Sequence, residues 1–518
     1  MTRQVRQDGL MVFGLALFAR VLAALPQTQP NTMDAAYYLV GGQRLAQGYG
    51  FNDPYVWHYL DAPQSLPHPS HLYWMPLPSI LAAVSQAIFG VNFRAAQLPF
   101  VLLSAALPVL AYAVAWRVSS TRRHAWLAAL FTIFSPFYLA YWGVPESFAP
   151  FGVFGSLALW LGNRPERRWG LSAGVCAGLA HLSRADGFLL LIPVALSGFK
   201  VMPHSSFIPR RALSRIGLIL LGYLLVMGPW FARNLSVIGS PLSSAGAQAA
   251  WLCEYDELFT LDAQFDVNHL LSCGVERVLT SRVNGVTAGA VHLLAEGGMI
   301  FLTPPIVVGL WRRRAVFSGA LIYLALLFAV MTMVFPFAGD RGGLFHSMSA
   351  LLPFFYAAAP PGLDALIEWV AARRRGWRAA TARRVFSMTL VVMALMLSAM
   401  IYRGRVIGAN FNDPIWNQAD RAYSAIGRWL IEQGETDPIV VVNNPPLFTY
   451  HTGLRSIVIP WGDEADLLAA ARRFGATWVV LDANRPAPLA ELYAAGGSAA
   501  VQSAAVIDGH ILLNITLP

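Results

Sequence analysis

Residues 96–123 read AQLPFVLLSAALPVLAYAVAWRVSSTRR and contain the pattern that decides the fold. Residues 96–116 carry no charged side chain, and Arg117, Arg122 and Arg123 follow directly. An apolar helix needs about 20 residues to cross the hydrocarbon core of a bilayer, and basic residues collect at the cytoplasmic ends of such helices. The stretch therefore predicts a membrane-spanning helix whose C-terminal end faces the cytoplasm.

Similar apolar runs recur along most of the chain, whose composition is 56% hydrophobic and only 13% charged. Soluble domains contain about 25% charged residues, so most of this chain avoids water. We predict a polytopic α-helical membrane protein with about eleven transmembrane helices. The predicted spans are 9–25, 96–116, 124–141, 147–162, 169–183, 186–199, 213–232, 288–310, 315–335, 347–369 and 386–402.

The basic residues determine the predicted orientation in the cell (inner) membrane. With the N-terminus in the cytoplasm, the basic connections fall on the cytoplasmic side. They contain Arg3 and Arg6; Arg117, Arg122 and Arg123; Arg164, Arg167 and Arg168; Lys200, Arg210, Arg211 and Arg215; Arg312, Arg313 and Arg314; and Arg373, Arg374, Arg375, Arg378, Arg383 and Arg384. Counting 72–90 as a span would place the later clusters outside, so we predict an interfacial helix there. A cleaved signal peptide is the alternative for the first span, and it also leaves residue 30 outside.

The hydropathy falls after Ile401 and divides the chain into two predicted domains. Residues 1–402 form a transmembrane catalytic domain, whose first external loop is 26–95. Residues 403–518 form a small extracytoplasmic α/β domain, because short β-rich runs alternate there with helical stretches. We expect strands at 439–443, 456–460, 477–482 and 511–515, and an amphipathic helix at 463–474.

The sequence lacks zinc-binding spacings and glycine-rich nucleotide-binding motifs. The topology explains the net charge of +9, so nucleic acid is not a predicted partner. We predict no cofactor, and a divalent metal is not indicated. Cys253 and Cys273 share the predicted external loop 235–287, where a disulfide can form. The alternative is a pair of free thiols.

Charged residues gather at the predicted outer ends of the spans. Such placement is costly near a membrane and therefore marks candidates for function. Asp34 follows the first span, and Glu146 stands in the turn between the third and fourth spans. The basic candidates on the same side are Arg184, Arg233, Arg341 and His346. Together they suggest a site that binds a phosphate and removes a proton. The structural alternatives are helix capping by Asp34, snorkelling arginines, and a local ion pair between Arg184 and Asp186.

Several short motifs occur in the order found in a known family. They are Met33-Asp-Ala-Ala-Tyr37 with Ala46-Gln-Gly48, His68-Pro-Ser-His-Leu-Tyr73, Pro145-Glu-Ser147, Leu182-Ser-Arg-Ala-Asp-Gly187, Pro229-Trp-Phe-Ala-Arg-Asn234, and Asn444-Pro-Pro446 with Tyr450-His-Thr-Gly453. With these motifs the chain resembles the GT-C membrane glycosyltransferases, in the superfamily of protein mannosyltransferases and aminoarabinose transferases. Members of that superfamily use polyprenyl-phosphate sugars, and the resemblance covers nearly the whole chain.

The resemblance implies a GT-C-like fold and a hexosyl- or pentosyltransferase for cell-envelope glycosylation. Asp34 matches the catalytic base of the family, and Glu146 matches the acid after the third span. The substrate-binding residues implied by the resemblance are Arg184, Arg233, Arg341, His346, Tyr37, His68 and His71, with the three arginines near the lipid phosphate. The chain departs from the family at Ala35, where many relatives carry a second acid. It also has Arg341-Gly-Gly in place of the usual Arg-Tyr pair.

The expected function is sugar transfer from a polyprenyl-phosphate donor to an acceptor hydroxyl, with inversion, on the extracytoplasmic side. The phosphate leaves as an anion and needs fixed positive charge, while the acceptor hydroxyl needs one base. The alternative is a lipid-linked sugar transporter or flippase, in which membrane acids and arginines also serve. The acceptor stays open among glycan, lipid and protein, and the sugar is also open.

Overall fold

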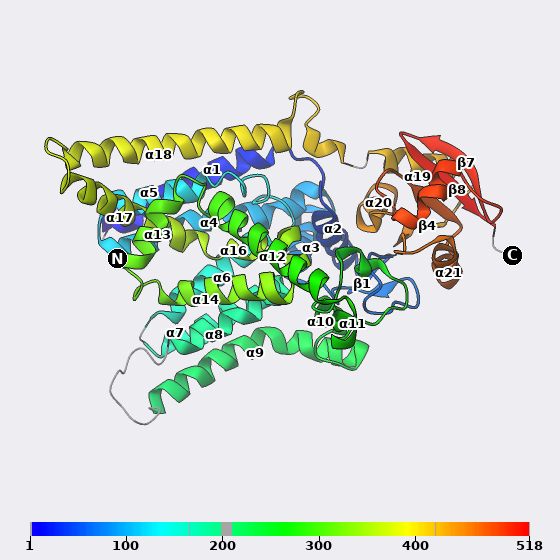
Figure 1. Ribbon diagram of the computed structural model, residues 1–518, viewed down its shortest axis with the longest axis horizontal. Helices are drawn as coiled ribbons and strands as arrows, with labels where there is room; N and C mark the ends of the chain where they lie inside the picture. Colours follow the sequence, from blue (N-terminus) through cyan, green and yellow to red (C-terminus); the bar gives the residue numbers. More distant parts are fainter. Residues whose placement is uncertain (1–2, 165, 198–209, 420, 517–518) are drawn as a thin grey trace.

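The computed structural model describes residues 3–164, 166–197, 210–419 and 421–516. Helices make up most of the chain before residue 407, and a sheet-containing domain follows at the C-terminus. Figure 1 shows the two parts at opposite ends of the long axis, with α2, α10 and α11 between them. Positions 198–199 of the predicted span 186–199, and Lys200 of a predicted basic cluster, lie outside the described residues.

Within the described residues, four helical stretches are by themselves long and apolar enough to cross a membrane. They correspond to α1 (Arg3–Ala24), α4 (Phe93–Ser119), α9 (Arg210–Ile238) and α18 (Ala379–Tyr402) with the π-turn Arg403–Ile407. A fifth span would be a pair bent by 113°, Ser318–Val334 with Pro336–Met348. The other helices of this part are α5 (Arg122–Ile133), α6 (Phe148–Gly162), α7 (Arg168–Ser183), α8 (Leu191–Leu196), α12 (Val275–Val291), α13 (Thr303–Arg312), α14 (Ser318–Ala329), α15 (Pro336–Ala338), α16 (Leu344–Met348) and α17 (Leu352–Ala371). The prediction of a polytopic helical protein is confirmed.

Two predicted spans have wrong boundaries. The span predicted at 288–310 begins earlier, because α12 starts at Val275 and takes residues assigned to the external loop 235–287. It is then interrupted by a π-helix at His292–Gly297 and by positive φ angles at Met299 and Ile300. The span predicted at 124–141 is also broken, since α5 ends at Ile133 and irregular turns continue to 147. Pro136 follows that end, and proline cannot continue a helical hydrogen-bond ladder.

The predicted cytoplasmic ends of several helices lie together. Asp8 of α1 accepts a hydrogen bond from Arg122 at the start of α5, over 2.7 Å. Asp364 of α17 pairs with His124 of α5 at 2.8 Å. In Figure 1 the N-terminus and the α17–α18 connection lie at the end of the molecule away from the sheet domain. The arginine-rich ends therefore face away from that domain.

The first loop, residues 26–95, which is predicted to be external, contains two short helices that pack against each other. They are α2 (Met33–Ala46) and α3 (Leu77–Phe89), and α3 occupies the stretch predicted as interfacial. A Cβ atom added at Gly42 would lie 2.8 Å from the Cβ atom of Ala82 in α3, which is too close. The close approach of α2 to α3 therefore requires glycine at this position. Val84, Ile88 and Phe89 leave an exposed apolar face on α3, as expected for a helix at a membrane surface.

A second segment joins α9 to α12 and lies beside the first loop. It contains α10 (Ser244–Gln248), a 3₁₀ turn at Tyr255–Phe259 and α11 (Val267–Ser272). Cys253 and Cys273 are joined by a disulfide, with their Cα atoms 5.7 Å apart. The predicted disulfide is confirmed.

The C-terminal part contains a six-stranded sheet with the strand order β2-β5-β4-β6-β8-β7. Its strands are β4 (Ile439–Val442), β5 (Arg455–Val458), β6 (Trp478–Leu481), β7 (Val501–Ile507) and β8 (His510–Ile515). The α/β prediction is confirmed with its four strands, and β7 is an addition. Asp508 and Gly509 join β7 to β8 with positive φ angles, as a two-residue hairpin turn requires.

The sixth strand, β2 (Tyr55–Val56), comes from the first external loop and pairs in parallel with β5. The same loop supplies a separate two-stranded sheet, β1 (Asn52–Asp53) with β3 (His68–Pro69). The first loop is therefore tied to the C-terminal part by backbone hydrogen bonds, although about 400 residues separate them.

Both faces of the six-stranded sheet are covered. Val441 of β4 packs in a core with α21 (Glu464–Phe474), while Val440 and Val442 point to the opposite core. The opposite core contains α19 (Ala422–Glu432), α20 (Pro445–Thr452) and Ala36 of α2. Two short helical turns, η7 (Ile415–Gln418) and η8 (Ala487–Leu489), and helix α22 (Ala490–Ala495) complete the domain. Helix α2 is thus held between the membrane helices and the sheet domain.

Candidate active site

A large cavity opens where the helical part meets the first loop and the segment between α9 and α12. It has a volume of about 460 Å³, within the range of small-molecule sites. Its wall combines Asp34 of α2, Arg184 and Asp186 after α7, and Arg341 and His346 around α16. The structure therefore brings five of the predicted site residues into one cavity: Asp34, His71, Arg184, Arg341 and His346.

Asp34 lies in the first turn of α2 and does not cap it. Thr32 is the N-cap, and its hydroxyl accepts a hydrogen bond from the Ala35 N–H at 3.2 Å. The capping alternative for Asp34 is therefore wrong, since the cap position is already filled. Burial raises the pKa of the Asp34 carboxyl above its ordinary value, and the positive charge of Arg184 opposes that shift. A carboxylate with a raised pKa can accept a proton near neutral pH.

Glu146 lies behind Asp34 and is not part of the cavity wall. It is 2% exposed, and its carboxylate accepts a hydrogen bond from the Thr32 hydroxyl. Burial raises the pKa of Glu146, and the negative charge of Asp34 adds to that shift. The two acids are therefore coupled, and Thr32 connects Glu146 to the start of the helix that carries Asp34.

Arg184 is held by several partners at the C-terminal end of α7. Its Nε donates to Asp186 Oδ1 at 3.0 Å and to Ser347 Oγ at 2.8 Å. A terminal nitrogen donates to Gly343 O at 3.4 Å. The predicted ion pair with Asp186 is confirmed. Because this pairing fixes a guanidinium at the cavity wall, it also provides preorganised positive charge.

Arg341 and His346 come from the bend between α14 and α16. Gly342 has φ 105°, which only glycine adopts readily, so the Arg341-Gly-Gly sequence forms this bend. The Arg341 guanidinium lies 4.3 Å from the centre of the Tyr255 ring, a cation–π contact. The His346 ring stacks on Phe148 at 3.8 Å, and its Nδ1 lies 3.0 Å from Ser147 Oγ.

Arg233 differs from the other two predicted arginines. It is not among the residues that line the cavity, although its neighbours Trp230 and Asn234 are. Its guanidinium donates to the backbone oxygen of Phe51 at 3.0 Å and lies over the Trp230 ring at 4.8 Å. The cavity therefore gives no support to the expectation that Arg233 lines the phosphate site, which stays a prediction. Its observed contacts hold the first external loop against α9.

The three remaining predicted residues surround a second, much smaller cavity. Tyr37, His68 and His71 line it, and His71 also lines the large cavity. The Tyr37 hydroxyl accepts a hydrogen bond from the His71 N–H at 2.7 Å, while His68 pairs with Asp61 at 2.8 Å. The small cavity has a volume of about 10 Å³, room for about one water molecule. Tyr37 and His68 therefore do not reach the large cavity and support the loop around it.

Aromatic side chains form much of the large cavity wall and were not predicted individually. Trp57 and Trp74 stack in parallel with ring centres 4.0 Å apart, and both line the cavity. Both belong to an aromatic-rich part of the first loop, and this composition could have indicated a binding surface from the sequence. Tyr255 also lines the cavity, but nothing in its local sequence indicates this position. Such rings offer flat apolar surfaces with polar edges.

The described residues contain one group of three potential metal ligands whose atoms lie within 4.8 Å of one another. That group is Cys253, His269 and Cys273, so it lies at the disulfide and does not include Asp34. The sequence-based expectation that the active site needs no metal stays a prediction.

The fold is that of the GT-C membrane glycosyltransferases, and the resemblance seen in the sequence is confirmed. The sequence model of the family described as dolichyl-phosphate-mannose-protein mannosyltransferase matches residues 68–231. That range contains Glu146 and Arg184 but not Asp34. No curated protein sequence matches the chain.

Solved structures of two relatives share the fold. ArnT from Cupriavidus metallidurans in the apo state has a TM-score of 0.58 at 13% identity, over 98% of this chain and 97% of that one. The structure of the same protein bound to undecaprenyl phosphate has a TM-score of 0.57 at 14% identity, over 98% of this chain and 97% of that one. The oligosaccharyltransferase of Archaeoglobus fulgidus gives 0.50 at 13% identity, over 92% of this chain and 69% of that one.

Proposed function

We propose that this protein transfers a sugar from a polyprenyl-phosphate donor to an acceptor hydroxyl on the extracytoplasmic side. The observation that carries the proposal is the shared cavity of Asp34 and Arg184, which places a carboxylate and a fixed guanidinium around one space. A protein of the same fold, ArnT, has been solved with undecaprenyl phosphate. The family description also names a lipid-phosphate sugar.

The donor phosphate would lie against Arg184 and Arg341. A guanidinium presents a planar set of donors that matches phosphate oxygens, and a phosphate leaving group gains negative charge as its bond to the sugar breaks. Arg184 is already oriented by Asp186 and Ser347, so little reorganisation is needed during the reaction. Arg341 is held on the Tyr255 ring.

Asp34 would act as the base. The acceptor oxygen attacks C1 of the sugar from the side opposite the phosphate, the C1–O bond to the phosphate breaks, and the acceptor proton passes to the Asp34 carboxylate. One displacement from the opposite side inverts the anomeric configuration. Glu146 supports Asp34 through Thr32, so it acts as a positioning residue and shares the titration of the pair.

The outer location of the site rests on the distribution of arginines. The arginine-rich helix ends face away from the sheet domain (Figure 1), and basic residues mark the cytoplasmic side. The cavity and residues 403–518 then face outward. Protease added to intact spheroplasts should remove the sheet domain. Protection of that domain until the membrane is opened would reverse the proposed orientation.

Turnover of the donor tests the enzymatic proposal directly. Detergent-purified protein would be incubated with a panel of radiolabelled undecaprenyl-phosphate hexoses and pentoses and with candidate protein, lipid and glycan acceptors. At least one donor should yield free undecaprenyl phosphate and a labelled product of inverted configuration. Transport of a labelled donor across proteoliposomes without release of free undecaprenyl phosphate would favour the flippase alternative and reject the transferase.

A further inference from the structure

The disulfide-closed segment Cys253–Cys273 connects the cavity wall to the sheet domain. Two of its residues, Tyr255 and Leu258, line the large cavity. The next residue, Phe259, accepts a backbone hydrogen bond from Trp461 at 2.8 Å. Farther along, Asp262 forms an ion pair with Arg473 of α21. Whatever closes this segment therefore positions both a wall of the cavity and a contact with the sheet domain.

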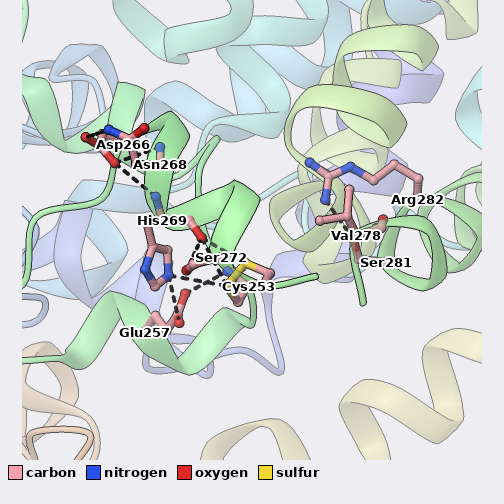
Figure 2. The surroundings of a disulfide bond; sticks show 10 residues. Cys253, Glu257, Asp266, Asn268, His269, Ser272, Val278, Ser281 and Arg282 are labelled. Atoms are coloured by element: carbon pink, nitrogen blue, oxygen red, sulfur yellow. Dashed lines mark hydrogen bonds and ion pairs between the residues drawn. A yellow bond between two sulfur atoms is a disulfide. The ribbon is translucent and has the colours of Figure 1, made fainter. Parts of the chain in front are cut away.

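The two cysteines are accompanied by a histidine and a carboxylate (Figure 2). His269 Nε2 lies 3.3 Å from Cys253 Sγ and 3.0 Å from Glu257 Oε1. The other carboxylate oxygen of Glu257 accepts the Cys253 N–H at 2.7 Å. One ligand atom each from Cys253, His269 and Cys273 lie within 4.8 Å of one another. Ligand atoms of Cys253, His269 and Cys273 thus lie close together, and the Glu257 carboxylate contacts the His269 ring of this group.

The backbone around the cluster holds these side chains in place. His269 is in α11, whose N-cap Asp266 accepts the backbone N–H groups of Asn268 and His269. Figure 2 shows the His269 ring directed toward Glu257 and Cys253. A histidine held this way lies among the sulfurs and the carboxylate without needing a large rearrangement of the chain.

We propose that this cluster is a Zn²⁺ site when the disulfide is reduced, with Cys253, Cys273 and His269 as ligands and Glu257 as the fourth. Zinc in structural sites is tetrahedral and takes thiolate, imidazole and carboxylate ligands at about 2.0–2.3 Å. Ligand atoms around such an ion are then separated by about 3–4 Å, which matches the 3.0 Å and 3.3 Å distances at His269.

The conversion balances as two separate reactions. A phosphine reductant with one water molecule gives the phosphine oxide, and the disulfide takes up two electrons and two protons to form two thiols. Zn²⁺ then displaces both thiol protons, and the single ring proton of neutral His269 is carried by Nδ1 so that Nε2 can bind the ion. Metal binding therefore releases protons, and it excludes the disulfide because each sulfur is used once.

The same segment would thus be closed either by a disulfide or by a metal ion. Both closures join residues 253 and 273, so both would hold Tyr255 and Leu258 at the cavity. On an oxidising membrane face the disulfide is expected. A chain that is still reduced would use the ion.

Cobalt uptake tests the site because tetrahedral thiolate-bound Co²⁺ has intense visible bands. Full-length protein in detergent would be reduced with a phosphine, freed of reductant without oxygen, and titrated with Co²⁺ alone and then with Zn²⁺. The reduced protein should take up one Co²⁺ per chain with a thiolate spectrum, and Zn²⁺ should displace it. The oxidised protein should show no such spectrum.

Variants separate this site from adventitious binding. Cys253→Ser should abolish the spectrum, and His269→Asn should weaken Co²⁺ binding by at least about tenfold, as loss of a metal-site group does. Cys176→Ser removes the free cysteine of α7, and His292→Asn removes a histidine paired with Glu296 away from the disulfide. After reduction, both control variants should bind Co²⁺ with the same spectrum and affinity as the native protein.

Two results would overturn the proposal. One is a folded, reduced protein that shows no thiolate–Co²⁺ spectrum. The other is unchanged affinity in His269→Asn, a variant that can be purified with its disulfide intact and reduced afterward, so that folding does not depend on the missing ligand.

Discussion

Asp34 and Asp53 are two acids of the same external loop with very different surroundings. Asp34 faces a cavity of about 460 Å³ with two arginines in its wall. Asp53 lines a cavity of about 10 Å³ among tyrosines and histidines. Burial raises the pKa of both acids, for Asp53 to about 8. A raised pKa alone therefore does not identify a catalytic acid, because only Asp34 has room beside it for a substrate.

The largest expected effect is on Asp34. Asp34→Asn should lower the rate of sugar transfer by about 10²–10⁴, as loss of a base does, while α2 keeps its Thr32 cap and the protein stays folded. Asp53→Asn is the matched control and should reduce the rate by less than about tenfold. Equal losses in the two variants would break the distinction between the acids. Full activity in a folded Asp34→Asn protein would remove Asp34 from the mechanism.

The next effect separates two arginines. Arg184→Lys keeps the charge but loses the planar set of donors, so the donor KM should rise by about 10- to 100-fold, in line with about 1.5–3 kcal/mol for a hydrogen bond to a charged group. Arg233→Lys should change the donor KM by less than about threefold, because its side chain bonds to the Phe51 oxygen and does not line the cavity. Steady-state kinetics with a thermal melt of each variant would measure both. A larger KM effect in Arg233→Lys than in Arg184→Lys would show that Arg233 binds the donor.

The coupled acids predict the pH dependence. Burial raises the pKa of Asp34 and of Glu146, and the base works only when ionised. The value of kcat/KM should therefore fall about tenfold per pH unit on the acid side, beginning above the ordinary pKa of an aspartate. Two interacting acids titrate in two steps. The acid limb of the pH profile of kcat/KM should therefore show a single step in Glu146→Gln. An acid limb that is the same in the native protein and in Glu146→Gln would show that the pair does not titrate together.

The smallest effect concerns stability at Asp53. Its raised pKa of about 8 means that the folded protein holds a proton that the unfolded chain loses near pH 4. Stability should therefore decrease as pH rises from about 4 to about 8. Asp53→Asn cannot ionise, so its melting temperature should fall less over this range and exceed that of the native protein near pH 8. Melting curves at pH 5 and pH 8 would measure this difference. A parallel decline in both proteins would assign the pH effect to other groups.

Local patterns predicted the elements whose signals are short-range. The helix expected at 463–474 forms with Asp463 and Asp466 in a reciprocal capping box, because such caps depend on residues three positions apart. The strands β4 and β6 are uniformly apolar, as strands covered on both faces are. Asp34 was found because a lone acid beside a span is unusual.

Long-range contacts account for what the sequence missed. The direction of Arg233 depends on Phe51, which lies far away in the chain, and Tyr255 reaches the cavity through a segment closed by a disulfide. The start of α12 was assigned to a loop because its first turns contain several polar residues. An amphipathic helix also contains polar residues on one face, so this composition does not distinguish a helix from a loop. These features depend on how distant segments pack, which local periodicity does not record.

The two-residue strand β2 has a consequence for how the protein is made. Tyr55 leaves the ribosome early, but its partner Ser456 follows about 400 residues later, which is roughly 20–80 s at ordinary rates of synthesis. Until then the first loop carries an unpaired strand. A nascent chain released before residue 456 would lack this pairing, so a full-length product is required to complete the loop that carries Asp34.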